Sequence, residues 1–234
     1  MGVGGPLEVG NAHVNQNTAA NLGSSALTVK ADVTNTSSSS QTGTVTATVT
    51  PPGGGLPVTV SQSVTVAANA TSTVTFDPSA NPSLTLSSPQ IWWPWQMGAQ
   101  PLYTLGVSVA QGSTTLNSTS ETFGIRTIQS SLVGAGSATP SGVRQFGVNG
   151  KNIVIRGGGW SPDLFLRYSP ADPAQQIGIL KSMGINEVRL EGHFMPADWY
   201  QQMDAAGILV NVGYQCCDFW EATSYTAAQN TVYQ

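Results

Sequence analysis

Three segments in the second half of the chain each have the pattern of an apolar strand that ends abruptly in polar, aromatic or acidic residues. They are residues 151–165 (KNIVIRGGGWSPDLF), 185–194 (INEVRLEGHF) and 208–221 (ILVNVGYQCCDFWE). The two stretches between them, residues 172–184 and 195–207, carry apolar residues at helical intervals. This order of strand, helix, strand, helix and strand predicts parallel strands joined by helical crossovers.

The second half is therefore constrained to an α/β fold, and an α/β barrel places its chemistry at the carboxyl ends of its strands. Asp172 is predicted to cap the first helix, with Pro173 in its first turn, and Gly184 and Gly207 are predicted to follow the two helices. A closed barrel needs eight strand and helix units in roughly 250 residues. We expect the first third of a barrel here, from a longer parent.

The first half of the chain has a different composition. Residues 1–120 hold only four of the twenty charged residues and are rich in Ser, Thr, Val and Gly. Strict alternation in residues 44–50, 63–68 and 72–76 predicts the short antiparallel strands of a β-sandwich, with Val facing the core and Thr facing water. Residues 51–57 (PPGGGLP) are predicted to connect two strands, and residues 37–43 (SSSSQTG) to form a loop rather than a disordered linker.

These patterns predict two domains and a connection. The predicted fold is multidomain, an immunoglobulin-like β-sandwich in residues 1–128 followed by the first βα units of a (β/α)8 barrel in residues 145–234. A linker is predicted in residues 129–144, which include the segment SSLVGAGSATPSG.

Composition also limits the partners. A net charge of −4 argues against a nucleic-acid partner, which needs a basic patch. No run of 18 apolar residues is present to span a membrane, and the first ten residues lack the regions of a signal peptide. A Ser- and Thr-rich first half with one lysine suits a secreted or extracellular parent. His13, His193, Cys216 and Cys217 have no metal-ligand spacing, so we expect no metal or other cofactor.

Trp92, Trp93 and Trp95 have two interpretations. The three rings can form an exposed platform on which sugars stack, or they can be packed as a plug at a domain interface. Tryptophan is mostly buried, and Pro94 and Pro101 make the segment rigid and non-helical, so the sequence favours packing.

Five motifs in order carry a family resemblance. They are residues 92–103 (WWPWQMGAQPLY), 120–128 (SETFGIRTI), 148–160 (VNGKNIVIRGGGW), 186–193 (NEVRLEGH) and 216–221 (CCDFWE). Together they resemble the central part of glycoside hydrolase family 2, and within it the exo-β-D-glucosaminidases, which degrade chitosan. The β-mannosidase branch is the nearest alternative.

The resemblance implies an immunoglobulin-like sandwich packed on a (β/α)8 barrel, and retaining hydrolysis of a β-linked sugar in an oligosaccharide or polysaccharide. Such chemistry uses a proton donor and a nucleophile about 5 Å apart. In the family these come from barrel strands four and seven, so both are expected beyond residue 234. The isolated chain is expected to be inactive, with the remainder of the barrel supplied by the full-length parent.

Candidate substrate-binding residues lie at or after the predicted strand ends. They are Trp160, Asp163, Glu191, His193, Asp218, Trp220 and Glu221. The carboxylates would bind the ammonium of a glucosamine unit, and the aromatic rings would line the pocket. For each acid there is a simpler alternative: an ion pair with a barrel arginine for Glu191, a turn for Asp163, and a solvated loop for Asp218 and Glu221.

Gln215 departs from the expected pattern, because glucosaminidase-like members are expected to have an acid just before the Cys pair. A neutral amide attracts a cationic amine less than a carboxylate does, so the amino-sugar preference is open at this point. Two further hypotheses remain. The chain is a non-catalytic carbohydrate-binding or adhesive module, which exposed tryptophan rings would favour, or it is a fragment with no function of its own.

Overall fold

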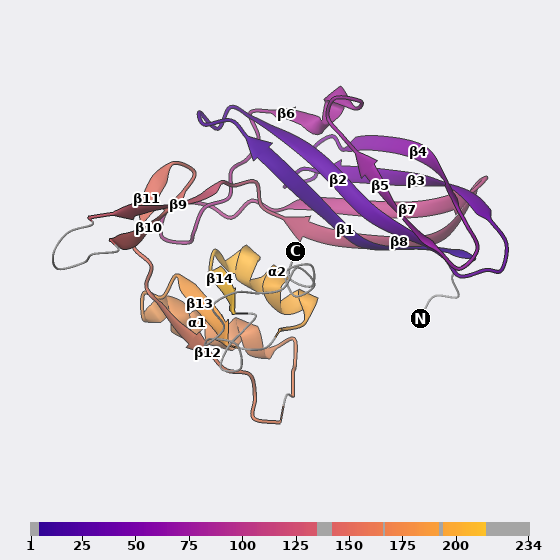
Figure 1. Ribbon diagram of the computed structural model, residues 1–234. Coiled ribbons are helices and arrows are strands. Elements are labelled where there is room, and N and C mark those ends of the chain that lie inside the picture. The colour runs from indigo at the N-terminus through magenta and orange to yellow at the C-terminus, as the bar shows by residue number, and fades with distance from the viewer. Residues whose placement is uncertain (1–4, 135–141, 166, 192–193, 214–234) are drawn as a thin grey trace. The chain divides into compact units, whose positions relative to one another are not determined.

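The structure is a computed structural model that describes residues 5–134, 142–165, 167–191 and 194–213 (Figure 1). Contacts divide the chain into two compact units. The first, called the sandwich unit below, holds Met1–Trp92, Pro101–Gln129 and Gly147–Lys151. The second, called the α/β unit, holds Trp93–Gln100, Ser130–Phe146 and Asn152–Gln234.

The sandwich unit consists of two antiparallel sheets. One has the strand order β1-β2-β5 with β6 also paired to β2, and the other has the order β4-β3-β7-β8. The strands are β1 (Leu7–Thr18), β2 (Ser24–Asn35), β3 (Gln41–Thr50), β4 (Val58–Val66), β5 (Thr71–Phe76), β6 (Thr85–Ser87), β7 (Tyr103–Gln111) and β8 (Thr114–Phe123). A 3-10 turn, η1 (Pro82–Leu84), precedes β6.

The alternation in β3 acts as predicted. Val45, Ala47 and Val49 are buried in the sandwich core, and the threonines between them face outward. Two of these threonines pair with hydroxyls of β4: Thr46 Oγ1 lies 2.8 Å from Ser61 Oγ, and Thr48 Oγ1 lies 3.2 Å from Thr59 Oγ1. The alternation in the sequence therefore determines which residues of β3 face the core and which face water.

The two predicted connections also have the expected character. Residues 51–57 join the antiparallel pair β3 and β4, with Gly53 and Gly54 at φ +77°, a conformation that side chains rarely adopt. Residues 36–40 connect β2 to β3, so the loop predicted for residues 37–43 ends three residues earlier, because residues 41–43 already pair with β4. Asn35 at the end of β2 is fully buried, and its amide donates to the carbonyl oxygens of Ser39, Val66 and Ala67.

The region predicted to be a linker contains strands. β9 (Ile128–Val133), β10 (Val143–Val148) and β11 (Lys151–Ile153) form a sheet in the order β11-β10-β9. Asn149 and Gly150, at φ +52° and +75°, make the two-residue turn between β10 and β11. Every residue of β9 is exposed, so no burial pattern marks it as a strand, and the Ser and Gly residues of the region 129–144 resemble those of a linker.

The α/β unit has the predicted order. β12 (Gly157–Trp160), α1 (Asp172–Ser182), β13 (Glu187–Glu191), α2 (Ala197–Ala206) and β14 (Leu209–Gly213) follow one another, and the sheet order β12-β13-β14 is parallel throughout (Figure 1). Its buried apolar residues are Val188, Leu190, Trp199, Met203, Ala206 and Ile208. No described helix is long and apolar enough to cross a membrane.

The ends of the two helices agree with the sequence prediction except at one residue. Gly184 and Gly207 both have φ +74° and follow α1 and α2. Asp172 was predicted to be the cap of α1, but the cap position is Ala171 and Asp172 is the first helical residue. Its carboxylate lies in the first turn, where the helix dipole favours negative charge, so the error is one residue in position.

Candidate functional site

The carboxyl ends of the three parallel strands lie at one edge of the sheet. Trp160 at the end of β12 pairs in register with Leu190, and Glu191 at the end of β13 pairs with Gly213 of β14. The backbones of Trp160 and Glu191 are therefore brought to the same edge, as the strand pattern predicts. The side chain of Glu191 lies outside the described part of the structure.

Trp160 belongs to an aromatic cluster. Its ring centroid lies 5.4 Å from that of Trp199 in an edge-on arrangement, and Trp199 in turn lies 5.2 Å from Tyr200. The indole Nε1 atoms of Trp160 and Trp199 are buried and have no hydrogen-bond partner among the described residues. Trp160 is thus held in place by packing, and its N–H donor is free of a protein partner in this part of the chain.

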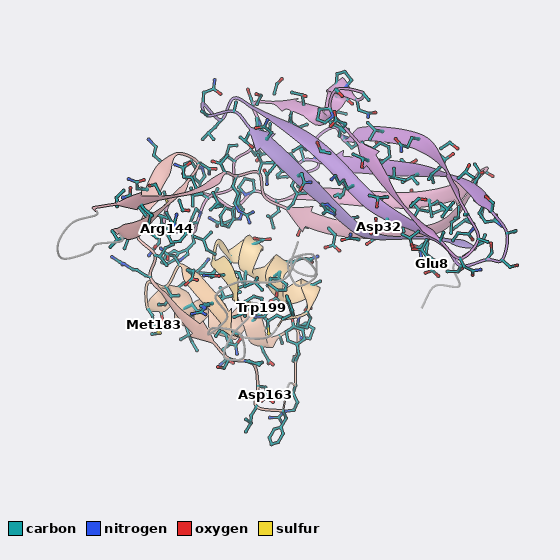
Figure 2. All side chains as sticks on the ribbon, in the orientation of Figure 1. Glu8, Asp32, Arg144, Asp163, Met183 and Trp199 are labelled. Atoms are coloured by element: carbon teal, nitrogen blue, oxygen red, sulfur yellow. The ribbon has the colours of Figure 1, made fainter. Side chains whose placement is uncertain are left out.

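Asp163 lies at the end of a loop that extends from the α/β unit (Figure 2). Its Oδ1 accepts from the Phe165 backbone N–H (3.0 Å) and from Arg167 Nε (2.9 Å), while its Oδ2 accepts from Arg167 Nη2 (2.9 Å). The hydrogen bonds from Arg167 and Phe165 lower the pKa of Asp163 to about 2. The carboxylate therefore stays ionised, and it shapes its own turn while being paired to a guanidinium.

A cleft of about 50 Å³ lies between this loop and the two helices. Its lining includes Trp160, Asp163, Tyr168, Asp172 and Trp199. The Tyr168 hydroxyl donates to the Asp198 carboxylate. Desolvation, followed by the bond to Asp198 and the charges of Asp198 and Asp172, raises the pKa of Tyr168 to about 12, so this hydroxyl keeps its proton over the physiological pH range.

The remaining candidates fall elsewhere. His193, Asp218, Trp220 and Glu221 lie outside the described residues, so their substrate-binding roles stay predictions. The same applies to Gln215.

The residues that sequence reasoning missed are Arg167, Tyr168, Asp198 and Trp199. The i, i+4 spacing of Asp163 and Arg167 was a weak local signal for their ion pair. Tyr168 and Asp198 are 30 positions apart, and no pattern in the sequence links them.

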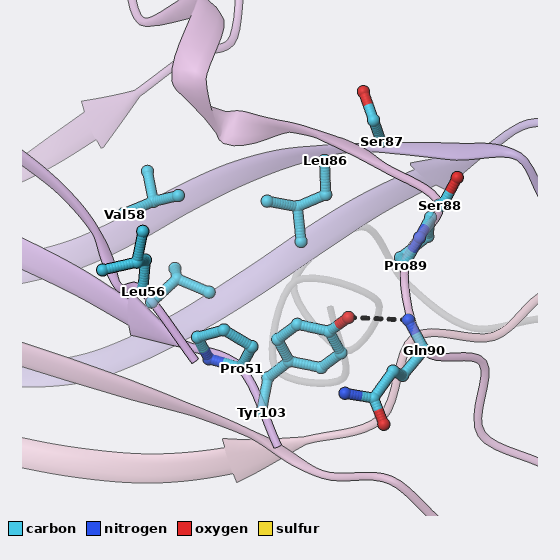
Figure 3. A pocket seen from close by; sticks show the side chains of 10 residues that line it. Pro51, Leu56, Val58, Leu86, Ser87, Ser88, Pro89, Gln90 and Tyr103 are labelled. Atoms are coloured by element: carbon cyan, nitrogen blue, oxygen red, sulfur yellow. Dashed lines mark hydrogen bonds between the residues drawn. The ribbon is translucent and has the colours of Figure 1, made fainter. Parts of the chain in front are cut away.

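The sandwich unit has a pocket of its own, of about 220 Å³ (Figure 3). Its lining is mainly aliphatic and includes Val49, Pro51, Leu56 and Leu86, together with the buried Tyr103. The Tyr103 hydroxyl accepts from the Gln90 backbone N–H at 2.8 Å. Burial raises the pKa of Tyr103. A pocket with aliphatic walls and a buried ring lacks the open aromatic face on which sugars stack.

The tryptophan platform required by the binding-module hypothesis is also absent from the described residues. Trp92 is fully buried in the sandwich unit, with the Arg126 guanidinium 4.8 Å from its ring centroid, and Trp93 and Trp95 are partly buried. Packing, the interpretation that the sequence favours, describes the observed environment of Trp92.

The described fold is an antiparallel sandwich followed by parallel βα units whose strands end at one edge of the sheet, and the comparison with protein families assigns its class, the glycoside hydrolases. The chain belongs to glycosyl hydrolases family 2, whose family model matches residues 7–126.

Three relatives document the relationship. The chain is 39% identical over 219 residues to an exo-beta-D-glucosaminidase of Streptomyces avermitilis, covering 93% of this chain and 23% of the relative. It is 34% identical to the crystal structure of Amycolatopsis orientalis exo-chitosanase CsxA, with a TM-score of 0.77 over 98% of this chain and 26% of that one. It is 34% identical over 133 residues to a mannosylglycoprotein endo-beta-mannosidase of Lilium longiflorum, and the match covers 55% of this chain and 13% of the relative. The chain thus spans about a quarter of the length of the first two.

Proposed function

We propose that this chain is part of a β-glycosidase that releases glucosamine units from chitosan or related oligosaccharides. The observation that carries the proposal is the 39% identity to an exo-beta-D-glucosaminidase along 93% of the chain, which includes both the sandwich and the parallel βα units. Similarity over both units supports a common arrangement of the sheet edge at which a sugar would bind.

In the proposed mechanism hydrolysis is retaining, with a proton donor and a nucleophile about 5 Å apart. We assign both groups to barrel strands beyond residue 234. The part played by this chain is then binding and orientation, and by itself it should cleave no glycosidic bond.

The groups proposed to contact the sugar lie at the carboxyl edge of the sheet. Glu191 follows directly from β13, and Asp218 and Glu221 follow β14 in the sequence. Carboxylates there would accept charge-assisted hydrogen bonds from a glucosamine ammonium. Asp163 is a weaker candidate for binding the sugar, because Arg167 already donates hydrogen bonds to both of its carboxylate oxygens. Trp160 would line the site while being anchored by Trp199.

A β-mannosidase is the second candidate, and one residue favours it. Gln215 stands where an acid is expected in glucosaminidase-like sequences, and its neutral amide can both donate to and accept from a sugar hydroxyl. Mannose has no amino group, so its recognition needs no carboxylate at this position.

The test is hydrolysis of aryl β-glucosaminide and aryl β-mannoside by this chain and by a form extended through the following codons of its gene. We expect activity only in the extended form, with glucosaminide preferred. Preference for mannoside would favour the second candidate. Activity of the chain alone would contradict the assignment of the acid and nucleophile.

Site residues are tested in the extended form by comparing Glu191→Gln with Glu187→Gln. The two acids stand at opposite ends of β13, so the substitutions are matched in chemistry and in strand. Glu191→Gln should raise KM for the glucosaminide at least about tenfold by removing one charge-assisted hydrogen bond. Glu187→Gln should leave KM unchanged, and equal effects would remove Glu191 from the site.

A further inference from the structure

Residues Trp93–Gln100 stand in the sequence between sandwich strands β6 and β7, yet their contacts place them in the α/β unit. We call them the tryptophan strap. The strap is folded on itself: the Trp93 N–H donates to the Ala99 carbonyl oxygen (2.9 Å), the Met97 N–H to that of Pro94 (2.7 Å), and the Gln100 amide to that of Trp93 (3.0 Å). It therefore presents its side chains from a defined backbone.

Trp95 joins the strap to the connections that follow both helices. Its backbone N–H donates to the carbonyl oxygen of Gly207 (3.0 Å), two residues before β14, and its indole Nε1 donates to that of Ile185 (2.9 Å), two residues before β13. Its ring packs against the apolar cluster of the α/β unit, and Lys181 Nζ lies 5.7 Å from the ring centroid. One side chain thus ties together the amino ends of two neighbouring strands.

Gln96 links the strap to the third strand, β12, through hydrogen bonds of Asn186. Gln96 Nε2 donates to the Gly184 carbonyl oxygen (3.3 Å), and its Oε1 accepts from Asn186 Nδ2 (3.0 Å). Asn186 is 1% exposed; its Nδ2 also donates to the Val154 carbonyl oxygen (2.9 Å), and its Oδ1 accepts from the Arg156 N–H (2.9 Å). Residues 154–156 lead into β12, so the network reaches the amino ends of all three strands.

We propose that the tryptophan strap is a docking segment for the amino end of the parallel sheet, and that the α/β unit keeps this sheet only while the strap is bound. The sheet has three short strands and a small apolar core, whereas the buried Asn186 side chain has hydrogen-bond partners for both its amide nitrogen and its amide oxygen. Removing the strap would leave the Asn186 amide one acceptor short and would expose the Trp95 face of the core. This inference is independent of the proposed enzymatic activity.

Two glycines provide a matched test. Gly207 and Gly184 both have φ +74°, so alanine at either position meets the same backbone strain. A Cβ at Gly207 would lie 2.6 Å from the Trp95 backbone nitrogen, whereas a Cβ at Gly184 would meet only Arg156 Nη1 at 3.6 Å. The difference between Gly207→Ala and Gly184→Ala therefore isolates the strap contact.

The measurement is amide hydrogen exchange of the full chain, comparing Val188 and Val210 in the parallel sheet with Val45 and Val107 in the sandwich. Gly207→Ala should accelerate exchange of the first pair about tenfold more than Gly184→Ala does, and it should leave the second pair unchanged. Equal acceleration by the two variants would overturn the proposal.

A milder substitution covers the case in which Gly207→Ala fails to fold. Trp95→Phe keeps an aromatic ring in the cluster and removes the indole donor to Ile185, and Trp93→Phe in the same strap leaves that hydrogen bond in place. Faster exchange at Val188 in Trp95→Phe than in Trp93→Phe supports docking by the strap. The same exchange rate in both variants would contradict it.

Discussion

The sandwich unit and the α/β unit are stabilised in different ways. In the described residues, the sandwich buries one cluster of nineteen apolar side chains, drawn mostly from Val and Leu on alternating strand positions. The α/β unit buries six, and two of these, Trp199 and Met203, are large side chains of one helix. Because hydrophobic stabilisation scales with buried apolar area, the sandwich spreads its stability over many positions and the α/β unit concentrates it in a few.

The two units also differ in some of their polar interactions. Outward threonines of β3 pair with neutral hydroxyls across the sheet, as in Thr46 with Ser61. The α/β unit instead uses a charged pair, Asp163 with Arg167, and a carboxylate acceptor, Asp198, for Tyr168. Such hydroxyl pairs do not depend on pH, whereas the Asp163–Arg167 pair does. The sandwich also has a pH-dependent contact, because Asp32 accepts from Thr73 Oγ1 and Asn11 Nδ2 and these hydrogen bonds lower its pKa.

The largest expected effect is in the sandwich core. Phe76 is 1% exposed, and Phe76→Ala should lower the free energy of unfolding by about 3–5 kcal/mol through lost burial and an unfilled cavity. Denaturant titration followed by circular dichroism measures it. Phe165→Ala, at a side chain that is 75% exposed, should change the value by less than about 0.5 kcal/mol. Similar losses in both variants would show that the cluster is not the source of stability.

The next effect is in the smaller core. Met203 is fully buried in the α/β unit, and Met203→Ala should cost about 2–5 kcal/mol there. Hydrogen exchange should show this loss at β13 and β14 while the sandwich amides keep their protection. Met183→Ala, at an exposed position after α1, is the control and should have little effect. Loss of protection in both units would mean that they unfold together, which would contradict the view that each unit is stabilised by its own core.

A smaller effect is expected on the outer face of the sandwich. Thr46→Ala removes the hydroxyl pair with Ser61 and should cost about 0.2–1 kcal/mol. Thr44→Ala lies on the same strand and face, at a residue for which the structure describes no hydroxyl pair, so it controls for the intrinsic strand preference. Urea midpoints of the two variants give the difference, and a larger loss in Thr44→Ala would argue against a contribution from the pair.

The smallest effect on stability, with a clear local signal, concerns Asp163. Arg167→Gln should raise its pKa from about 2 toward 3.8, because the guanidinium is the main cause of the lowered value. Any stabilisation from the pair is present above pH 3.8 and is lost as the pH falls toward 2. Carboxyl chemical shifts followed through an acid titration measure the pKa. Arg144→Gln, at a side chain that bonds Ser130, should leave it unchanged; an unshifted pKa in Arg167→Gln would contradict the assignment.

Local patterns predicted the elements whose form depends on nearby residues. The alternation in residues 44–50 predicted which side chains of β3 face the core, and the glycines at 184 and 207 marked the ends of the helices. β1 carries no comparable run of Val and Thr, and its place is set by pairing with β2. β9 falls almost wholly within residues 129–144, which the sequence predicts to be a linker, and because all its residues are exposed there is no burial pattern from which the strand could have been predicted.

The candidate site was predicted at the level of the sheet edge but not of its contacts. Placing Trp160 and Glu191 at the same edge required only the order of strands and helices. The packing of Trp160 on Trp199 and the bond from Tyr168 to Asp198 join residues 30 or more positions apart, which no spacing rule connects.

The sequence by itself determined the division into an alternating antiparallel half and a parallel βα half, because strand and helix periods depend on neighbouring residues. Only the tertiary structure decided that Trp93–Gln100 belongs with the parallel strands rather than with the sandwich strands beside it in the sequence. The physical reason is that Trp95 and Gln96 find their acceptors and donors at residues 184–207, and such partners become available only when the chain has folded.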